Sequence, residues 1–199
     1  MTRSFLPWVL MLGIFAGNVH AQPRAVPVTG SGVAYELKGY SVLAPPGKDW
    51  YELKRDPQSV FFGKKIASRT HAFIATAMSA VIPDKFETPK AFLDYIGRVL
   101  PLRGDGRHRV IENRVEMDGG PGRFCVRYYL KSEDRDAPYA QGKSLLAETF
   151  GVTCLHPENA NLNISVSYTE RGHPAETSAE LRGEGEHFVR SLKFVPHQP

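Results

Sequence analysis

Residues 71–100 read HAFIATAMSAVIPDKFETPKAFLDYIGRVL, and this stretch decides the fold class because it joins an apolar strand to an amphipathic helix. In residues 71–82 almost every side chain is apolar, and neighbours such as Phe73 and Ile74 point to opposite faces of a strand. A strand that is apolar on both faces is typical of the centre of a sheet that is covered on both sides. Small residues on one face, such as Ala75 and Ala77, leave room for a helix to pack closely.

A helix is predicted to follow over residues 89–100. Thr88 is a good N-cap, and Pro89 suits the first helical position, where its missing N–H costs nothing. Spacings of three and four then give one apolar stripe, which consists of Phe92, Tyr95, Ile96, Val99 and Leu100. We expect this helix to pack on the apolar strand that precedes it.

Further strands are predicted on both sides of this stretch. Alternating or apolar runs bounded by Gly and Pro lie at residues 33–37, 40–44, 50–53, 59–65, 110–117, 124–131, 146–155 and 161–168. A second helix is predicted to open at His173-Pro174, where Gly185 would let it sit close to the sheet. Strands and helices do not alternate, so the sequence predicts an α+β fold in which a mainly antiparallel sheet of about six to eight strands carries two main helices.

Three segments carry a resemblance to a known group of domains. They are GYSVLAPPGKDW at residues 39–50, TPKAFLDYI at residues 88–96, and the turn GGPGRF at residues 119–124. Over about residues 32–195 their order and turn style resemble the PsbP-like group of α+β domains. The resemblance implies a three-layer sandwich on a central antiparallel sheet. It also implies a binding or accessory role, since members of that group are mostly not enzymes.

The N-terminus has the pattern of a secretory signal peptide. Arg3 precedes the apolar run FLPWVLMLGIFA, and Val19-His20-Ala21 places small residues at a cleavage site after Ala21. The alternative, a transmembrane anchor, needs about 20 apolar residues, and this run is shorter. We therefore predict a signal peptide at residues 1–21, a flexible leader at 22–31, one α+β domain at 32–195 and a C-terminal tail at 196–199. The predicted location is periplasmic or secreted, with no transmembrane segment after cleavage.

Composition excludes several classes of protein. Hydrophobic residues make up 42% of the chain and charged residues 23%, which are globular values rather than those of disordered or fibrous chains. The 25 basic and 21 acidic side chains give a net charge of +4, and the basic residues are scattered. A nucleic-acid binder would show a basic stripe interleaved with exposed aromatic residues, so no nucleic-acid partner is predicted.

The sequence shows no pattern typical of a catalytic, cofactor or metal site. There is no G-x-S-x-G turn, no glycine loop ahead of a helix, and no H-x-x-x-H or H-E-x-x-H spacing. Glu184 and His187 are three apart on the second predicted helix and are interpreted as an exposed pair. The loop acids Asp105 and Asp134 are interpreted as solvated. No catalytic, cofactor-binding or metal-binding residue is therefore assigned, and no cofactor is expected.

Adjacent aromatic residues leave two alternatives open. The pairs are Trp50-Tyr51, Phe61-Phe62 and Tyr128-Tyr129, and within a strand the two members of a pair point to opposite faces. The outward member packs under a helix or loop, or it lines an exposed groove for a ligand or partner.

Cys125 and Cys154 are the only cysteines. An even count in an oxidising compartment indicates a disulfide. If the strands that carry them form a hairpin centred between residues 139 and 140, the two cysteines face each other across the ladder. Cα atoms of such a pair lie about 4.5–5.5 Å apart, which a disulfide tolerates. Two buried free thiols remain the alternative.

These features together predict a secreted, periplasmic, non-enzymatic binding or accessory protein with an unknown protein or small-molecule partner. Two alternatives stay open. One is a hydrolase whose site is assembled from distant residues, which would require a cleft holding a histidine and a carboxylate within hydrogen-bond reach. The other is a protein that binds a membrane surface through its modest positive charge.

Overall fold

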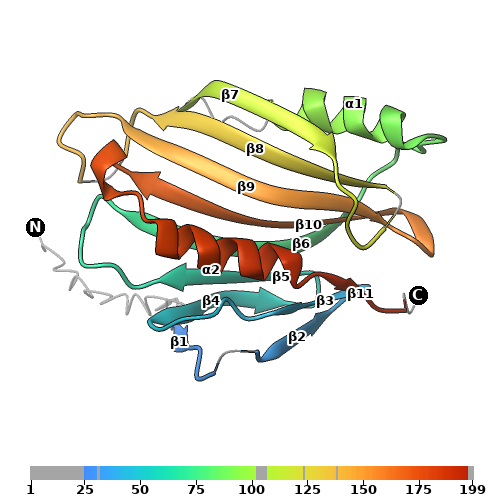
Figure 1. The fold of residues 1–199 in the computed structure, drawn as a ribbon, viewed down its shortest axis with the longest axis horizontal. Helices are drawn as coiled ribbons and strands as arrows, with labels where there is room; N and C mark the ends of the chain where they lie inside the picture. Colours follow the sequence, from blue (N-terminus) through green and yellow to red (C-terminus); the bar gives the residue numbers. More distant parts are fainter. Residues whose placement is uncertain (1–24, 31, 102–106, 123, 138, 197–199) are drawn as a thin grey trace, which may run out of the picture.

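The computed structural model describes residues 25–30, 32–101, 107–122, 124–137 and 139–196. In these residues, two antiparallel sheets are combined with two α-helices (Figure 1). The predicted α+β class is therefore confirmed. The predicted count of about six to eight strands holds for the larger sheet, which has eight, and three further strands form a second, smaller sheet.

The larger sheet contains eight strands and is antiparallel throughout. In spatial order they are β1 (Val26–Pro27), β4 (Trp50–Asp56), β5 (Ser59–Lys64), β6 (Ala72–Val81), β10 (Asn159–Gly172), β9 (Leu145–His156), β8 (Cys125–Asp134) and β7 (His108–Met117). β1 lies within the range expected to be a flexible leader, yet it pairs with β4 at one edge of the sheet.

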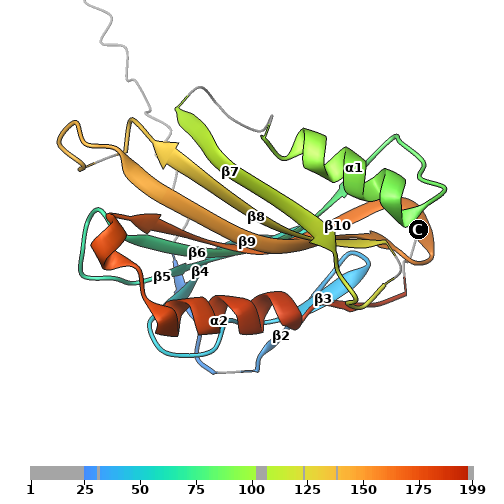
Figure 2. The same ribbon diagram turned by 45° about the horizontal axis from the view of Figure 1, so that its top comes forward.

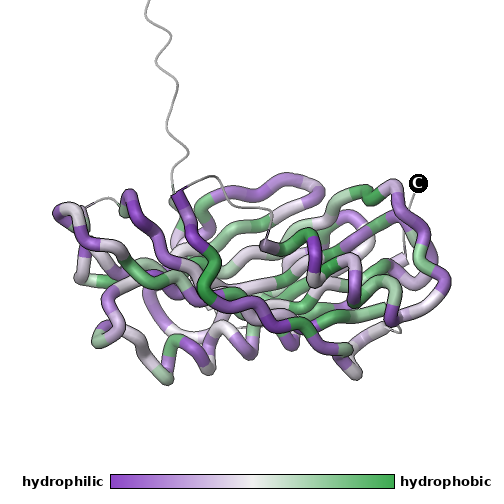
Figure 3. Tube along the Cα trace, turned by 90° about the horizontal axis from the view of Figure 1, so that it is seen from above, coloured by the Kyte–Doolittle hydropathy of each residue, from purple (hydrophilic) through white to green (hydrophobic). Residues whose placement is uncertain are grey.

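A smaller sheet and two helices cover the larger sheet. The smaller sheet consists of β11 (Lys193–Phe194), β3 (Tyr40–Leu43) and β2 (Ala34–Leu37). It lies with α2 (Ala179–Arg190) on one face of the larger sheet, and α1 (Pro89–Val99) lies on the other face (Figure 2). Hydrophobic and hydrophilic residues are mixed along the strands (Figure 3), as expected where the two faces differ in environment.

Each face has its own hydrophobic core. Under α2 and the smaller sheet, the aromatic side chains of Trp50, Phe62, Phe73, Tyr168 and Phe188 are at most 2% exposed. Under α1, Phe92 and Ile96 pack with the β8 and β9 residues Val126, Tyr128 and Leu155. Burial of each large apolar side chain contributes about 1.5–3 kcal/mol, so the aromatic core fixes α2 against the sheet.

The two helices begin where a side chain caps them. α1 begins at Pro89 as predicted, because the Thr88 hydroxyl accepts a hydrogen bond from the Ala91 N–H at 3.2 Å. The start predicted for the second helix is wrong. Pro174 opens a 3₁₀ turn, η2 (Pro174–Glu176), and the α-helix begins only after Ser178, whose hydroxyl accepts from the Leu181 N–H.

The expected cover of the apolar strand is also wrong. Phe73, Ala75 and Ala77 of β6 are buried on the α2 face, but Ile74 on the other face is 39% exposed. The helix that follows β6 in the chain packs instead against β7 and β8. The room left by the small alanine side chains is therefore used by α2, the later helix, which contacts β6.

The strands β8 and β9 form the predicted hairpin. Cys125 lies opposite Cys154, and the pairing runs without interruption to Asp134 opposite Leu145. A disulfide joins the two cysteines, with their Cα atoms 4.1 Å apart. Both cysteines are fully buried on the α2 face. Neither α-helix in the described part of the chain has the length and apolar character that a membrane-spanning helix needs.

Candidate functional site

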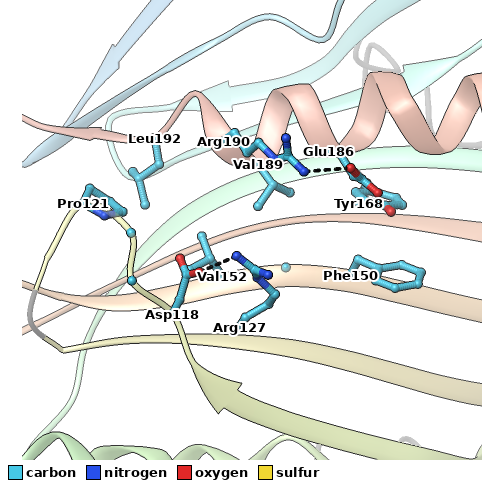
Figure 4. Close-up of a pocket in the computed structure, with 13 residues that line it drawn as sticks. Asp118, Pro121, Arg127, Phe150, Val152, Tyr168, Glu186, Val189, Arg190 and Leu192 are labelled. Atoms are coloured by element: carbon cyan, nitrogen blue, oxygen red, sulfur yellow. Dashed lines mark hydrogen bonds and ion pairs between the residues drawn. The ribbon is translucent and has the colours of Figure 1, made fainter.

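A cavity of about 580 Å³ opens between α2 and the strands β8 and β9, and we call it the α2 cavity (Figure 4). Phe150, Val152 and Tyr168 form its floor on the sheet. Glu186, Val189, Arg190 and Leu192 line it from α2 and the residues just after it, and the loop at residues 118–121 closes one end. This volume falls in the range of small-molecule sites, which are usually apolar with a few polar groups.

The floor belongs to a row of aromatic side chains that runs across three strands. Tyr129 of β8 pairs with Phe150 of β9, which pairs with Tyr168 of β10. Their ring centroids lie 4.6 Å and 5.3 Å apart, within the range of favourable aromatic pairs. Tyr168 is 2% exposed under α2, whereas Phe150 and Tyr129 are half-buried, so the row passes from the core into the open.

The open end of this row continues into a second hollow of about 570 Å³. It is lined from β7, β8 and β9, and shares Arg127 and Phe150 with the α2 cavity. The Arg114 guanidinium lies 4.6 Å from the centroid of the Tyr129 ring and covers the end of the row. The two hollows therefore form one groove along the α2 face of the sheet.

The charged groups of the α2 cavity form pairs with each other. Arg127 is paired with Asp118, and Arg190 bonds Glu186 at 3.1 Å, one turn away on the helix (Figure 4). These four lining charges sum to zero. A ligand in the cavity therefore meets no strong field of one sign, and its recognition depends on apolar contact and on individual hydrogen bonds.

The hydroxyl of Tyr168, a residue that lines the cavity, differs from the charged groups, which are paired with each other. It is buried and has no hydrogen-bond partner among the described residues. Burial, followed by the nearby Glu186 carboxylate, raises the pKa of this phenol well above its usual value, so the hydroxyl keeps its proton. It is therefore a hydrogen-bond donor at neutral pH.

Helix α2 approaches the floor closely at Gly185, as the sequence predicts. A Cβ atom on Gly185 would lie 2.6 Å from Cδ1 and 2.8 Å from Cδ2 of Tyr168, too close for carbon atoms. Glu184 fastens the same turn, because it accepts hydrogen bonds from Trp50 Nε1 at 2.8 Å and Lys64 Nζ at 2.7 Å. Interpreting Glu184 and His187 as an exposed pair is therefore wrong for Glu184, whose side chain is 10% exposed.

The disulfide lies beside the loop that closes the cavity. Cys125 O accepts a hydrogen bond from the Asp118 N–H at 2.9 Å, across the base of the loop. A Cβ atom on Gly122 would lie 3.6 Å from Cys125 Sγ and 3.1 Å from the Phe194 ring. The disulfide, the glycines and the smaller sheet thus hold this wall in place.

Two buried clusters differ from what the sequence predicts for their residues. Asp134 is fully buried rather than solvated, and Arg107 Nη2 and Arg171 Nη1 bond its Oδ2 at 2.6 Å and 3.1 Å. The Arg107 guanidinium in particular holds the pKa of this carboxyl below its usual value. Asp105, the other loop acid, lies outside the described residues.

The second cluster contains a histidine and a carboxylate within hydrogen-bond reach. His71 Nε2 lies 2.9 Å from Glu170 Oε1, which also accepts from the Ser178 N–H at 3.1 Å. His71 lines a shallow hollow, but the two side chains are only 8% and 3% exposed. The pair joins β6, β10 and the start of α2, which is a structural role. No group of three or more metal-ligating side chains occurs in the part of the chain that the structure describes.

The sequence predicts the site only in part. The alternative that an aromatic pair lines an exposed groove holds for Tyr128-Tyr129, since Tyr128 is buried under α1 and Tyr129 lines the groove on the other face. Phe150 belongs to no adjacent aromatic pair, but the hairpin register that aligns the cysteines also places it opposite Tyr129. The hairpin register therefore predicts two of the three rings of the aromatic row.

Comparisons with known proteins show the fold alone. No family model and no curated protein matches the chain. Its structure is similar to that of LpqN of Mycobacterium tuberculosis, which is involved in cell envelope biogenesis, with a TM-score of 0.50, 13% identity and coverage of 87% of this chain and 91% of LpqN. It is also similar to the Ran-binding protein Mog1p of Saccharomyces cerevisiae, with a TM-score of 0.44, 7% identity and coverage of 82% and 96%. The likeness to LpqN shows the fold alone, and it agrees with the α+β class that the sequence predicts.

Proposed function

We propose that this chain is a secreted, periplasmic binding or accessory protein, rather than an enzyme, and that its ligand occupies the α2 cavity. The observation that carries this proposal is the cavity itself, with its floor of Phe150, Val152 and Tyr168 and its wall of Val189 and Leu192. An apolar hollow of this size, built on rigid elements with a few polar groups at its rim, is the usual form of a small-molecule site.

The surrounding structure supports a preformed site. The floor lies on the adjacent strands β9 and β10, and α2 is held over it by the buried Phe188 ring and by the Glu184 hydrogen bonds. A site on such elements needs little ordering when a ligand binds, so more of the contact energy appears as affinity. Secretion is supported by the signal-peptide pattern at residues 1–21 and by the disulfide, which is typical of oxidising compartments.

A cavity-filling variant tests the proposal. The probe is N-phenyl-1-naphthylamine (NPN), a neutral aromatic dye that brightens in apolar surroundings, titrated into the purified protein. Val189→Trp places an indole in the cavity from the α2 wall and should abolish NPN binding. His187→Trp adds the same indole to the same helix at an exposed position that does not line the cavity, and should leave binding unchanged.

Two results would contradict the proposal. NPN binding that survives Val189→Trp, in a variant that still unfolds cooperatively, would place the ligand elsewhere. Turnover of a substrate by the purified protein in a broad hydrolase panel, lost on substitution of one cavity residue, would replace the binding function by an enzymatic one.

A further inference from the structure

We propose that the α2 cavity takes an aromatic ligand that carries an acceptor oxygen, such as a carboxylate or carbonyl, and that the Tyr168 hydroxyl donates a hydrogen bond to it. This inference rests on the proposed function and names the class of its ligand. It is argued from the unused hydroxyl, the aromatic floor and the charges of the rim.

The unused hydroxyl sets Tyr168 apart from other buried tyrosines of the fold. Tyr40 donates from its hydroxyl to Gln58 O at 3.0 Å, and the Tyr128 hydroxyl lies 3.3 Å from Ser165 Oγ. Leaving a buried polar group without a partner is costly, so native proteins seldom do it without a reason. The hydroxyl itself is buried, so a ligand atom in the cavity supplies the missing partner once the side chains that cover the hydroxyl move aside.

The chemistry of this hydroxyl decides what that ligand atom must be. Its raised pKa keeps the phenol protonated, and the neighbouring Glu186 carboxylate is already bonded to Arg190. The free function of Tyr168 is therefore donation, which requires an acceptor oxygen on the ligand. A charged acceptor gives the stronger bond.

The rest of the cavity favours an aromatic body. Phe150 and Tyr168 form the floor, and Val152 and Val189 add aliphatic surface. Ring-to-ring contacts are favourable in stacked and in edge-to-face arrangements, so a ligand ring can extend the aromatic row in more than one orientation. Arg127 and Arg190 stand at the rim, paired with Asp118 and Glu186, and their guanidinium planes can lie against a ligand ring.

Two dyes that differ only in the acceptor group test this inference. 8-Anilino-1-naphthalenesulfonate (ANS) is NPN with one added sulfonate, so the pair isolates the contribution of the acceptor. Tyr168→Phe removes the donor and leaves the ring and the net charge unchanged. Tyr40→Phe is the matched control, because it removes a buried hydroxyl at a position that does not line the cavity.

The inference predicts a specific pattern of dissociation constants. Wild-type protein should bind ANS more tightly than NPN, and Tyr168→Phe should weaken ANS binding about tenfold while leaving NPN binding unchanged. Tyr40→Phe should change neither. Thermal unfolding should also separate the two variants, since Tyr168→Phe removes an unpartnered hydroxyl and should not lower Tm, whereas Tyr40→Phe breaks a hydrogen bond and should lower it.

The possible failures are distinguishable. Suppose that Tyr168→Phe binds ANS as tightly as wild type, while Val189→Trp binds neither dye. This result would overturn the role of the hydroxyl but would leave the cavity as the binding site. Equal weakening of both dyes by Tyr168→Phe would also overturn it, because the ring environment and not the acceptor would then be responsible. Binding of both dyes by Val189→Trp would overturn this inference together with the proposed function.

Discussion

The two glycines of α2 offer a test of how closely this helix packs on the sheet. Gly183 and Gly185 lie two positions apart, and each lowers helix stability by about 1 kcal/mol relative to Ala. A Cβ atom on Gly183 meets nothing within 4 Å, whereas one on Gly185 overlaps the Tyr168 ring. Gly183→Ala should therefore raise the free energy of unfolding by about 1 kcal/mol, which is the gain in helix propensity.

Gly185→Ala gains the same helix propensity as Gly183→Ala, but it also loses packing energy. Overpacking of a well-packed core costs about 1–3 kcal/mol, because the ring of Tyr168 and the helix must move apart. The propensity terms cancel when the two variants are compared, so their free energies of unfolding should differ by about 1–3 kcal/mol with Gly185→Ala the less stable. For a protein of this size, the difference corresponds to about 2–12 °C in Tm.

The assay is urea unfolding followed by the fluorescence of Trp50. This residue is the only tryptophan after Ala21, and its indole N–H donates to Glu184 of α2, so it reports directly on docking of the helix. Equal stability of the two variants within about 0.5 kcal/mol would refute the close packing at Gly185, as would a more stable Gly185→Ala. The Gly185→Ala variant alone should also change NPN affinity, since Tyr168 forms part of the cavity floor.

Three further predictions concern the disulfide, the buried carboxylate and the signal peptide. Cys125 and Cys154 close a loop with a sequence separation of 29, and replacing both by Ala should lower the free energy of unfolding, measured in urea, by about 3–4 kcal/mol. Two alkylatable thiols in denatured, unreduced wild-type protein would instead show that no disulfide forms. Asp134→Asn leaves the Arg107 guanidinium without its anion and should cost about 2–3 kcal/mol at pH 7. Folding lowers the pKa of Asp134, so the ionised carboxylate stabilises the fold above its ordinary pKa of about 3.9, and this stabilisation is lost as pH falls below that value. Between neutral pH and pH 2, Asp134→Asn should therefore lose less unfolding free energy than wild type. Parallel plots of unfolding free energy against pH would contradict this. Expression of the full chain in a bacterium should give a periplasmic product whose intact mass matches a chain that starts at Gln22. An unprocessed product in the membrane fraction would support a membrane anchor instead.

Local signals predict those parts of the fold that depend on local chemistry. The start of α1 follows from Thr88 and Pro89, and the hairpin of β8 and β9 follows from two cysteines that have to face each other. Which helix covers β6 was not predictable in this way. The apolar stripe of α1 and the small side chains of β6 are compatible with each other, yet α2 occupies the position because Gly185 fits over Tyr168. Such a choice between two amphipathic helices depends on tertiary packing, which periodicity does not encode.

The α2 cavity shows why the site was harder to predict than the fold. The turn that joins β9 to β10 pairs Asn159 with His156, and continuing this register would place Ser165 opposite Phe150. The pairing instead moves to Asn163 opposite Leu155, so β10 gains three residues at this irregularity and Tyr168 comes to face Phe150. Side chains alternate between faces with a period of two, and an odd shift therefore exchanges the faces of the whole strand. Without it, Ser165 would occupy the α2 face and Tyr168 would lie on the other side of the sheet. The irregularity at residues 159–163 thus brings the third ring and its unused hydroxyl into the cavity, and a variant that restores the simple hairpin register should remove the site while retaining the sheet.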